Sequence, residues 1–225
     1  MTIAVLGATG MVGGRVVGEA RARGHRVLAL SRKPASEASE DPGVTPVAVD
    51  AGDPNAVGEA LTGSGADAVV LAVRTFPADQ EFLVAATRTV LDAAARLGIR
   101  VLVVGGAGAL RSPGDRERLI AENPAYVPDE YRAVALAGVA QLRTCQTHSG
   151  ADWVYLSPPA VLEPGSRTGR YRRGTDTLLT DADGRSWISA EDLAAAVLDE
   201  LERPGPHRHI TVVQDSTPKG ARGCA

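Results

Sequence analysis

The chain has 225 residues, a hydrophobic fraction of 44% and a net charge of −3. This balance is typical of a globular protein with a buried core, and the length suits one large domain. Lys and Arg total 24 against 27 Asp and Glu, so there is no overall positive field and we expect no nucleic-acid partner. Cys145 and Cys224 have no Cys or His cluster beside them, so the sequence indicates neither a disulfide framework nor a metal site.

The chain also lacks the patterns of a membrane or exported protein. No segment approaches the roughly 20 consecutive apolar residues that a membrane-spanning helix needs. The N-terminus runs from Met1 straight into an apolar stretch, without a charged leader and cleavage site. We therefore expect a cytoplasmic protein with no membrane partner.

Short apolar runs alternate along the chain with longer stretches of helical period, a pattern that predicts a parallel sheet covered by helices. The runs lack polar alternation, as expected of strands buried on both faces. The expected strands are Ile3–Leu6, Arg26–Leu30, Thr45–Val49, Ala68–Val73, Arg100–Val104 and Trp153–Leu156, and the expected helices are Met11–Arg23, Pro54–Leu61, Ala78–Leu97 and Pro128–His148. Gly24, Gly98 and Gly150 follow three of these helices, where a left-handed residue closes the last turn.

The pattern changes after the last of these strands. Residues 158–174 are rich in Pro, Gly and Arg, and we expect a small hairpin or loop excursion over 158–188, on the substrate side. Ser189 with Asp192 predicts a capped helix, and His209–Val213 a final strand. We expect one α/β domain over 1–214, a doubly wound, mainly parallel sheet with helices on both faces, and a flexible tail at 215–225.

A glycine-rich turn, GATGMVG at residues 7–13, lies between the first strand and the first helix. The first glycine allows a tight turn, the second removes a Cβ where a diphosphate would approach, and the third allows close helix packing. The amides of residues 9–12 would then face the anion at the positive end of the helix dipole. The sequence predicts a dinucleotide-binding turn, with a ligand-free turn as the alternative. Its predicted contacts are Gly7, Thr9, Gly10, Met11, Val12 and Gly13.

The end of the second strand reads Leu-Ser-Arg-Lys, without the acid that would accept from the ribose 2′-hydroxyl of NAD. The Arg32 guanidinium can bind a 2′-phosphate, so Ser31 and Arg32 predict NADPH as the cofactor; a solvated basic loop is the alternative. Asp50 is the candidate for the adenine amino group. Asp53 fits that role or the N-cap of the next helix equally well.

The glycine turn, Ser31-Arg32, the VVGGAG run at 103–108 and YLSPPA at 155–160 together resemble the atypical short-chain dehydrogenase/reductases. The similarity is greatest to the NAD(P)H-binding group of biliverdin/flavin reductases and NmrA-like proteins, and extends to about residue 213. Segments 163–165, 168–171 and 188–192 are similar to the C-terminal pattern of that group. The resemblance implies a Rossmann-type sheet that binds NADPH at the strand ends and transfers hydride to a flat conjugated acceptor.

On the family's pattern, three groups of residues would line the cofactor. The fourth-strand end would form a floor beneath the ribose, the glycine run would line the nicotinamide, and the double proline would hold its carboxamide by backbone contacts. These predicted contacts are Ala72, Val73, Gly105, Gly106, Ala107, Pro158, Pro159 and Ala160.

The chain departs from the ordinary members of that superfamily in its proton relay. They carry Tyr-x-x-x-Lys and a nearby Ser, which protonate a carbonyl oxygen as hydride arrives. Here Tyr131 is followed four residues later by Ala135, and residues 105–109 contain no hydroxyl. A quinone, flavin or extended tetrapyrrole needs no such relay, because its conjugated system spreads the arriving charge. We therefore expect a planar acceptor that is held mainly by position.

The acceptor-side candidates are Arg74, Arg111, Tyr126, Tyr131 and Tyr171, with Tyr131 ranked first and Arg74 second as catalytic residues. Arg167, Arg170, Arg172 and Arg173 could steer an acidic substrate or a cofactor phosphate, although a solvated loop is the simpler interpretation. An NADPH-dependent reductase is the first hypothesis and an NADP(H)-sensing regulator of the NmrA-like kind the second. An isomerase or dehydratase is a weaker third. A monomer or a homodimer would suit each of them.

Overall fold

The computed structural model describes residues 1–33 and 41–215. An eight-stranded sheet with the order β10-β12-β8-β5-β4-β1-β2-β3 forms its centre, and every neighbouring pair is parallel except β10 with β12. Its strands are β1 (Thr2–Leu6), β2 (Arg26–Ser31), β3 (Val44–Ala48), β4 (Ala68–Leu71), β5 (Arg100–Val104), β8 (Trp153–Ser157), β10 (Tyr171–Gly174) and β12 (His209–Gln214). The expected Rossmann-type α/β fold is confirmed.

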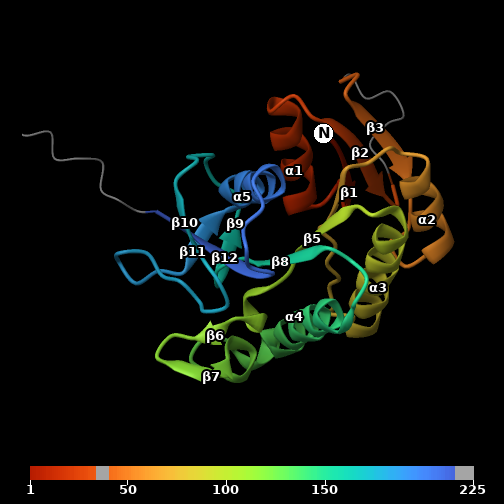
Figure 1. The fold of residues 1–225 in the computed structure, drawn as a ribbon. Coiled ribbons are helices and arrows are strands. Elements are labelled where there is room, and N and C mark those ends of the chain that lie inside the picture. The colour runs from red at the N-terminus through yellow and green to blue at the C-terminus, as the bar shows by residue number, and fades with distance from the viewer. Residues whose placement is uncertain (34–40, 216–225) are drawn as a thin grey trace, which may run out of the picture.

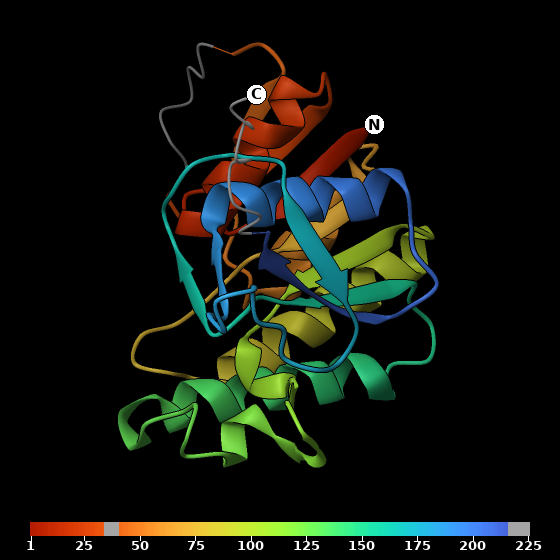
Figure 2. The same cartoon turned by 90° about the vertical axis from the view of Figure 1, so that its left-hand side faces the viewer.

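Helices cover both faces of this sheet (Figure 1). The helices are α1 (Met11–Ala22), α2 (Pro54–Thr62), α3 (Gln80–Leu97), α4 (Asp129–Thr147) and α5 (Ala190–Glu202). Helices α1 and α5 pack together on one face, and α2, α3 and α4 lie on the other, each face having its own apolar cluster. Figure 2 shows α5 and α4 on opposite sides of the strands.

The predicted segments all form, with small shifts at their ends. Helix α3 begins two residues later than expected, because the Asp79 carboxylate accepts from the Phe82 amide and caps it. Asp53 caps α2 in the same way, and the Ser189 hydroxyl accepts from the Asp192 amide at the start of α5. Gly24 and Gly98 are left-handed as expected, whereas Gly150 is not, because α4 ends three residues before it.

Strand β3 differs from the prediction that every strand is buried on both faces. It is the outer strand of the sheet, only partly buried, and contains Pro46, which an edge strand tolerates because its outer side needs no amide donor.

The 158–188 excursion forms three strands rather than a hairpin. β9 (Val161–Glu163) pairs in parallel with β11 (Trp187–Ser189), while β10 between them joins the edge of the main sheet. A second small element, not expected from the sequence, is the antiparallel pair β6 (Arg111–Ser112) and β7 (Asp115–Leu119), flanked by the 3-10 turns η1 (Ala107–Ala109) and η2 (Ile120–Glu122). Of the predicted flexible tail, all but Asp215 lies outside the described residues.

The strand order fixes where a ligand would bind. From β1 the chain proceeds outward to β2 and β3, and then crosses back to β4 on the other side of β1. Ligands of such sheets bind in the crevice beyond the carboxyl ends of the strands at this reversal, which here is the end of β1 and β4. The glycine turn begins at that point.

Candidate functional site

The glycine turn is shaped by close backbone contacts. Gly7 has a φ of +87°, and a Cβ on it would lie 2.4 Å from the Ala72 carbonyl oxygen at the end of β4. A Cβ on Gly13 would lie 2.0 Å from the Gly7 oxygen, so glycine is needed for α1 to approach the strand. Any larger residue at either position would push α1 or β4 away from the turn.

The start of α1 has the features of an anion site. Its N-cap is Gly10, and in the described chain no side chain caps it and no acidic residue occupies its first turn. Its first amides are therefore free to donate to an external group, with the helix dipole behind them. This arrangement fits a diphosphate.

The end of β2 lies beside this turn, since the Gly7 and Ala8 amides both donate to the Leu30 carbonyl at 3.0 and 3.2 Å. Ser31 follows Leu30, and its buried hydroxyl oxygen has no hydrogen-bond partner in the described structure. An unpartnered buried hydroxyl is costly and suggests a missing ligand. Arg32 and Lys33 next to it are exposed.

Asp50 and Asp53 follow β3. Asp53 is engaged as the α2 cap, with its Oδ1 accepting from the amides of Asn55 at 2.9 Å and Ala56 at 3.1 Å. Asp50 is exposed, and its Oδ1 accepts from the Gly52 amide at 2.9 Å. Of the two carboxylates, Asp50 has the fewer internal contacts and is the one still placed to meet a ligand.

A cleft of about 630 Å³ lies beyond the strand ends. It brings together Gly10, Met11 and Val12 from the turn, Ala72, Val73 and Arg74 after β4, the residues after β5, and Pro158, Pro159 and Ala160 after β8. Of the predicted cofactor contacts, Gly7, Thr9, Gly13, Ser31, Arg32 and Asp50 are not part of its lining. The other lining residues are Leu83, Val104, Gly105, Gly106, Ala107, Gly108, Ile120, Tyr126, Val127, Pro128, Tyr131, Val134, Ala135, Gly138, Gln141 and Leu162.

The cleft lining is mostly apolar and small. Arg74 is its one charged residue, and this side chain has no ion-pair or hydrogen-bond partner in the described parts of the chain. Tyr131 and Tyr126 stand at its edge, 57% and 39% exposed. The sequence did not single out α4 as one wall, although the small residues Ala135 and Gly138 are what let that helix approach the Gly105–Gly108 segment.

Two of the acceptor-side candidates lie elsewhere. Arg111 is paired with Asp176, Nε to Oδ2 at 3.2 Å, and does not line the cleft. The Tyr171 hydroxyl donates to Asp199 on α5, and burial together with this carboxylate raises the pKa of Tyr171. Of the five candidates, Arg74, Tyr126 and Tyr131 line the cleft.

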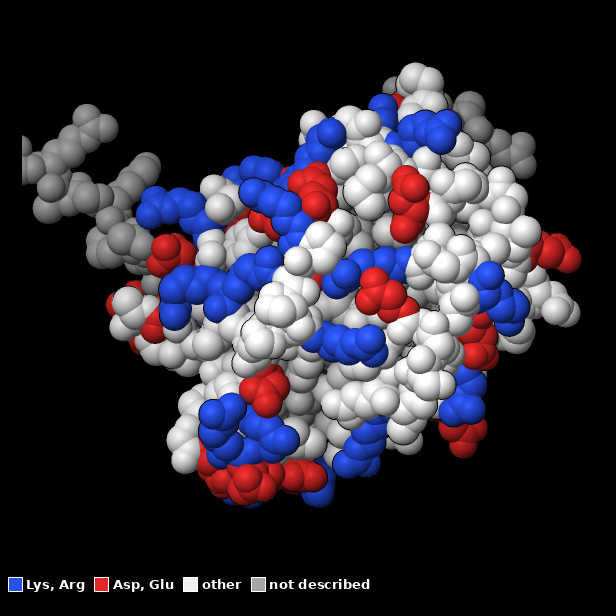
Figure 3. Space-filling view, viewed as in Figure 1, with Lys and Arg blue, Asp and Glu red and all other residues white. Residues whose placement is uncertain are grey.

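The arginines of the excursion are largely engaged within the protein. Arg167 binds the buried Glu19 of α1 through two hydrogen bonds, Nε to Oε2 at 2.6 Å and Nη2 to Oε1 at 2.7 Å. The Arg167 hydrogen bond is the main cause of the lowered pKa of Glu19. Arg173 pairs with the fully buried Glu200, and Arg172 donates to the Thr180 carbonyl. Figure 3 shows that acidic side chains (red) are interspersed with basic ones (blue) on the face that it draws.

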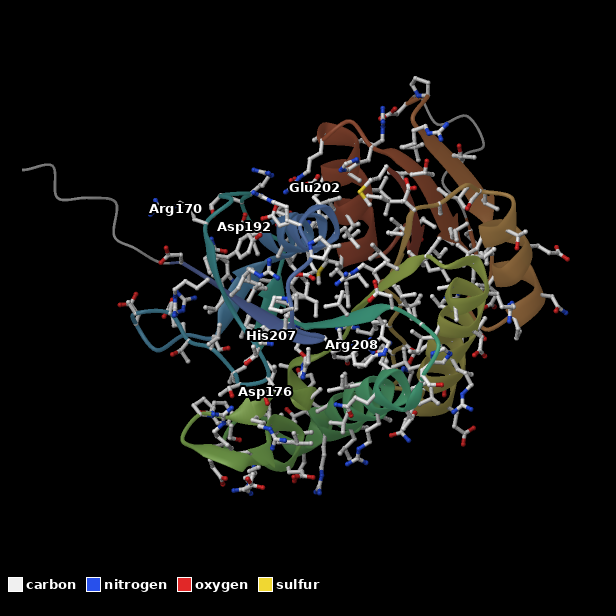
Figure 4. The ribbon with its side chains drawn as sticks, viewed as in Figure 1. Arg170, Asp176, Asp192, Glu202, His207 and Arg208 are labelled. Carbon is white, nitrogen blue, oxygen red and sulfur yellow. The ribbon has the colours of Figure 1, made fainter. Side chains whose placement is uncertain are left out.

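The Asp192 carboxylate joins several parts of the C-terminal region by hydrogen bonds. Its buried carboxylate accepts from the Thr168 amide at 2.8 Å, the Gly169 amide at 2.7 Å and Gln214 Nε2 at 2.8 Å. Figure 4 shows Asp192 on α5 beside the segment that carries Arg170. The carboxylate thus fastens the excursion to α5 and β12.

A chain of buried polar groups that the sequence reasoning missed lies behind the cleft. The Tyr155 hydroxyl donates to the Gly138 carbonyl at 2.9 Å and lies 3.3 Å from Gln141 Oε1. Gln141 Nε2 donates to Thr87 at 3.1 Å. Nearby, Ser157 Oγ and His209 Nε2 are 3.0 Å apart, and burial lowers the pKa of His209 to about 4. Such side chains look like ordinary core or strand residues in the sequence.

No group of three or more His, Cys, Asp or Glu side chains in the described part of the chain could hold a metal ion. No helix there is both long and apolar enough to cross a membrane.

A turn shaped for a diphosphate, at the end of the first strand of a Rossmann-type sheet, defines the class of nucleotide-binding α/β proteins. The comparison with family models specifies the class further. The model described as NAD(P)H-binding matches residues 7–204, and the chain belongs to that family.

Of three similar proteins, two cover almost the whole chain. The uncharacterized protein YwnB of Bacillus subtilis is 33% identical over 96% of this chain and 100% of its own length. A solved structure from Streptococcus pneumoniae, described as a candidate NADH-flavin reductase, is 28% identical, with a TM-score of 0.80 over 96% of this chain and 100% of that one. A Streptomyces 3-diazoavenalumate denitrifying reductase is 33% identical over 79% of this chain and 61% of its own length.

These relatives support an oxidoreductase-like protein that binds a nicotinamide cofactor. They also include a solved structure from Bacteroides thetaiotaomicron described as a candidate epimerase, 34% identical, with a TM-score of 0.83 over 96% of this chain and 98% of that one. The family therefore defines the cofactor class, and the reaction has to be argued from the site.

Proposed function

We propose that the protein is an NADPH-dependent reductase that transfers hydride to a planar, conjugated acceptor such as a quinone or a flavin. The observation that carries the proposal is the cleft: an apolar space of about 630 Å³, walled by glycine and alanine and edged by two tyrosines. A flat ring system can stack in such a space. The named reductases among the relatives support the same class of reaction.

The residues at the strand ends fit the cofactor. The uncapped start of α1 suits the diphosphate, and the unpartnered buried Ser31 hydroxyl suits an oxygen of the adenosine ribose or its phosphate. Arg32, exposed beside Ser31, is the group we assign to the 2′-phosphate. Asp50 is assigned to the adenine, and Pro158, Pro159 and Ala160 to the carboxamide end.

The cofactor would supply the hydride, and the protein would supply the positions of donor and acceptor. Gly105 and Gly106 form a wall without side chains that could hinder stacking, and Tyr126 and Tyr131 also line the cleft. Catalysis of this kind depends on holding the reacting carbons about 3–3.5 Å apart. The exposure of Tyr131 leaves water able to deliver the later proton.

Arg74 and Tyr131 have distinct roles in this proposal. As the one charged group of the lining, Arg74 can offset negative charge that develops on the acceptor. The Tyr131 hydroxyl can donate a hydrogen bond to an acceptor oxygen. Tyr131 has no lysine four residues later, so we assign it orientation of the acceptor and not an acid role.

The test measures the oxidation of NADPH, monitored by absorbance, with a panel of acceptors that contains menadione, a benzoquinone and FMN. We expect turnover with at least one acceptor, and a decrease of about tenfold or more in kcat/KM for Arg74→Ala, on the scale of one lost charge-stabilising contact. The matched control is Arg143→Ala, an exposed arginine of α4 outside the cleft.

NADPH binding without turnover on the whole panel would contradict the reductase proposal. That result would favour the regulatory alternative, which would then be examined by recovery of a protein partner. Equal losses in Arg74→Ala and Arg143→Ala would contradict the role given to Arg74.

A further inference from the structure

The side chain behind the predicted nicotinamide wall is Tyr155 of β8, which is fully buried. A Cβ on Gly105 would lie 1.9 Å from Tyr155 Cζ, so the ring occupies the volume directly behind that residue. The wall at Gly105 is therefore supported from behind by one side chain, through packing of the ring.

The phenol is in turn fixed by α4. It donates to the Gly138 carbonyl at 2.9 Å, and Gln141 Oε1 lies 3.3 Å away. Gln141 is itself held by Thr87 of α3, whose hydroxyl donates to the Leu83 carbonyl at 2.7 Å. The chain of hydrogen bonds runs from α3 through α4 to the wall of the cleft, and every member is buried.

We propose that Tyr155 is a positioning residue for hydride transfer, whose hydroxyl sets the distance between the Gly105–Gly106 wall and α4 and so the plane in which the nicotinamide lies. This inference rests on the proposed function. Tyr155 touches neither cofactor nor acceptor, because no part of it is exposed. It acts through the backbone in front of it.

The alternative is that Tyr155 only stabilises the fold, and the test separates the two roles. Tyr155→Phe keeps the ring that fills the space behind Gly105 and removes the hydroxyl. Tyr171→Phe is the matched control, because Tyr171 also lies in the sheet and also donates from a partly buried hydroxyl, but to Asp199 on the face of α5.

Three quantities are measured for each variant: the affinity for adenosine 2′,5′-bisphosphate, which lacks a nicotinamide, the affinity for NADPH, and kcat with the best acceptor. For Tyr155→Phe we expect unchanged bisphosphate binding, about fivefold weaker NADPH binding and about tenfold lower kcat, within the ~100-fold that a displacement of about 1 Å can cost. Tyr171→Phe should lower thermal stability and leave all three unchanged.

Two results would overturn the inference: a folded Tyr155→Phe with wild-type kcat and NADPH affinity, or equal losses of bisphosphate and NADPH affinity. If Tyr155→Phe does not fold, Thr87→Val is measured instead, because it removes the hydrogen bond that holds Gln141. It should weaken NADPH binding and lower kcat, both by less than expected for Tyr155→Phe, and leave bisphosphate binding unchanged. Wild-type NADPH affinity and kcat in a folded Thr87→Val would contradict the inference. Failure of the proposed function looks different, since the wild-type protein itself would then oxidise NADPH with no acceptor of the panel.

Discussion

Arg32 carries the choice between the two nicotinamide cofactors. It stands after β2, next to the unpartnered Ser31 hydroxyl, and the position holds no carboxylate that would repel a 2′-phosphate. Arg32→Ala should weaken NADPH binding by about 1–3 kcal/mol, the range of a charge-assisted hydrogen bond, and leave NADH binding almost unchanged. Fluorescence titration with both cofactors measures this difference. Equal losses for the two would refute the assignment.

The glycines of α1 make a second prediction at single positions. Gly13→Ala places a Cβ 2.0 Å from the Gly7 oxygen and must displace the turn, so we expect both stability and NADPH affinity to fall. On the same helix, a Cβ at Gly18 would have no atom within 4 Å. Gly18→Ala should therefore stabilise the fold by about 0.5–1 kcal/mol, because alanine loses less conformational entropy than glycine when a helix forms. Thermal unfolding with and without NADPH compares them. A neutral Gly13→Ala would show that close approach of α1 is not required.

Among the elements, α5 and the excursion depend on the Asp192 carboxylate. Asp192→Asn replaces a carboxylate that accepts several hydrogen bonds with an amide, one side of which can only donate. We expect the free energy of unfolding to fall by roughly 1.5–3 kcal/mol, the range for hydrogen bonds to a charged group. Denaturant unfolding provides the measurement. Asp183→Asn, in the exposed turn before β11, is the control and should change little. Similar losses of stability in both variants would argue against the role given to the Asp192 carboxylate.

Some of the helices, strands and caps could be predicted from the sequence and others could not. Long periodic segments and the glycine turn were predicted because local pattern determines them, and the cap at Ser189 because its spacing is short. For Asp53 the sequence left a cap and an adenine contact open, and the structure shows the cap. The path of residues 158–188 was not predicted, since β10 pairs with a strand about forty residues later in the chain. The segment is also held in place by Asp192 and Gln214, which lie outside it.

The site was predictable where backbone matters and hidden where side chains meet across the fold. Gly105, Gly106 and Pro158 line the cleft by virtue of following strands. Arg111 and Tyr171 were unsuccessful candidates for the acceptor side, because Asp176 and Asp199, distant in sequence, bind them. Tyr155 and Gln141 come together only through the packing of β8 against α4.

For the whole molecule, His209 predicts a dependence of stability on pH. Burial lowers its pKa to about 4 in the folded state, against about 6.5 in an unfolded chain. Between these values the unfolded state binds a proton that the folded state does not, so stability falls as the pH decreases from about 6.5 to 4, by on the order of 3 kcal/mol. Urea unfolding across this range should show the full decrease in the wild-type protein and in the control His207→Gln, whose histidine is exposed. His209→Gln should show a smaller decrease, from carboxylates such as Glu19 whose pKa is lowered in the fold. The same slope in all three would exclude His209 as its cause.

Binding of NADPH at the end of β1 is the property on which the roles of the turn and the cleft and the proposed reaction all depend. Calorimetric titration of the wild-type chain with NADPH and then with NADH measures it most directly. We expect one site per chain for NADPH and an affinity for NADH at least about tenfold lower, as the loss of a charged contact to the 2′-phosphate requires. Absence of binding heat with both cofactors, at concentrations up to the millimolar range where weak sites are detected, would contradict the assignment of the turn, the cleft and the reaction together.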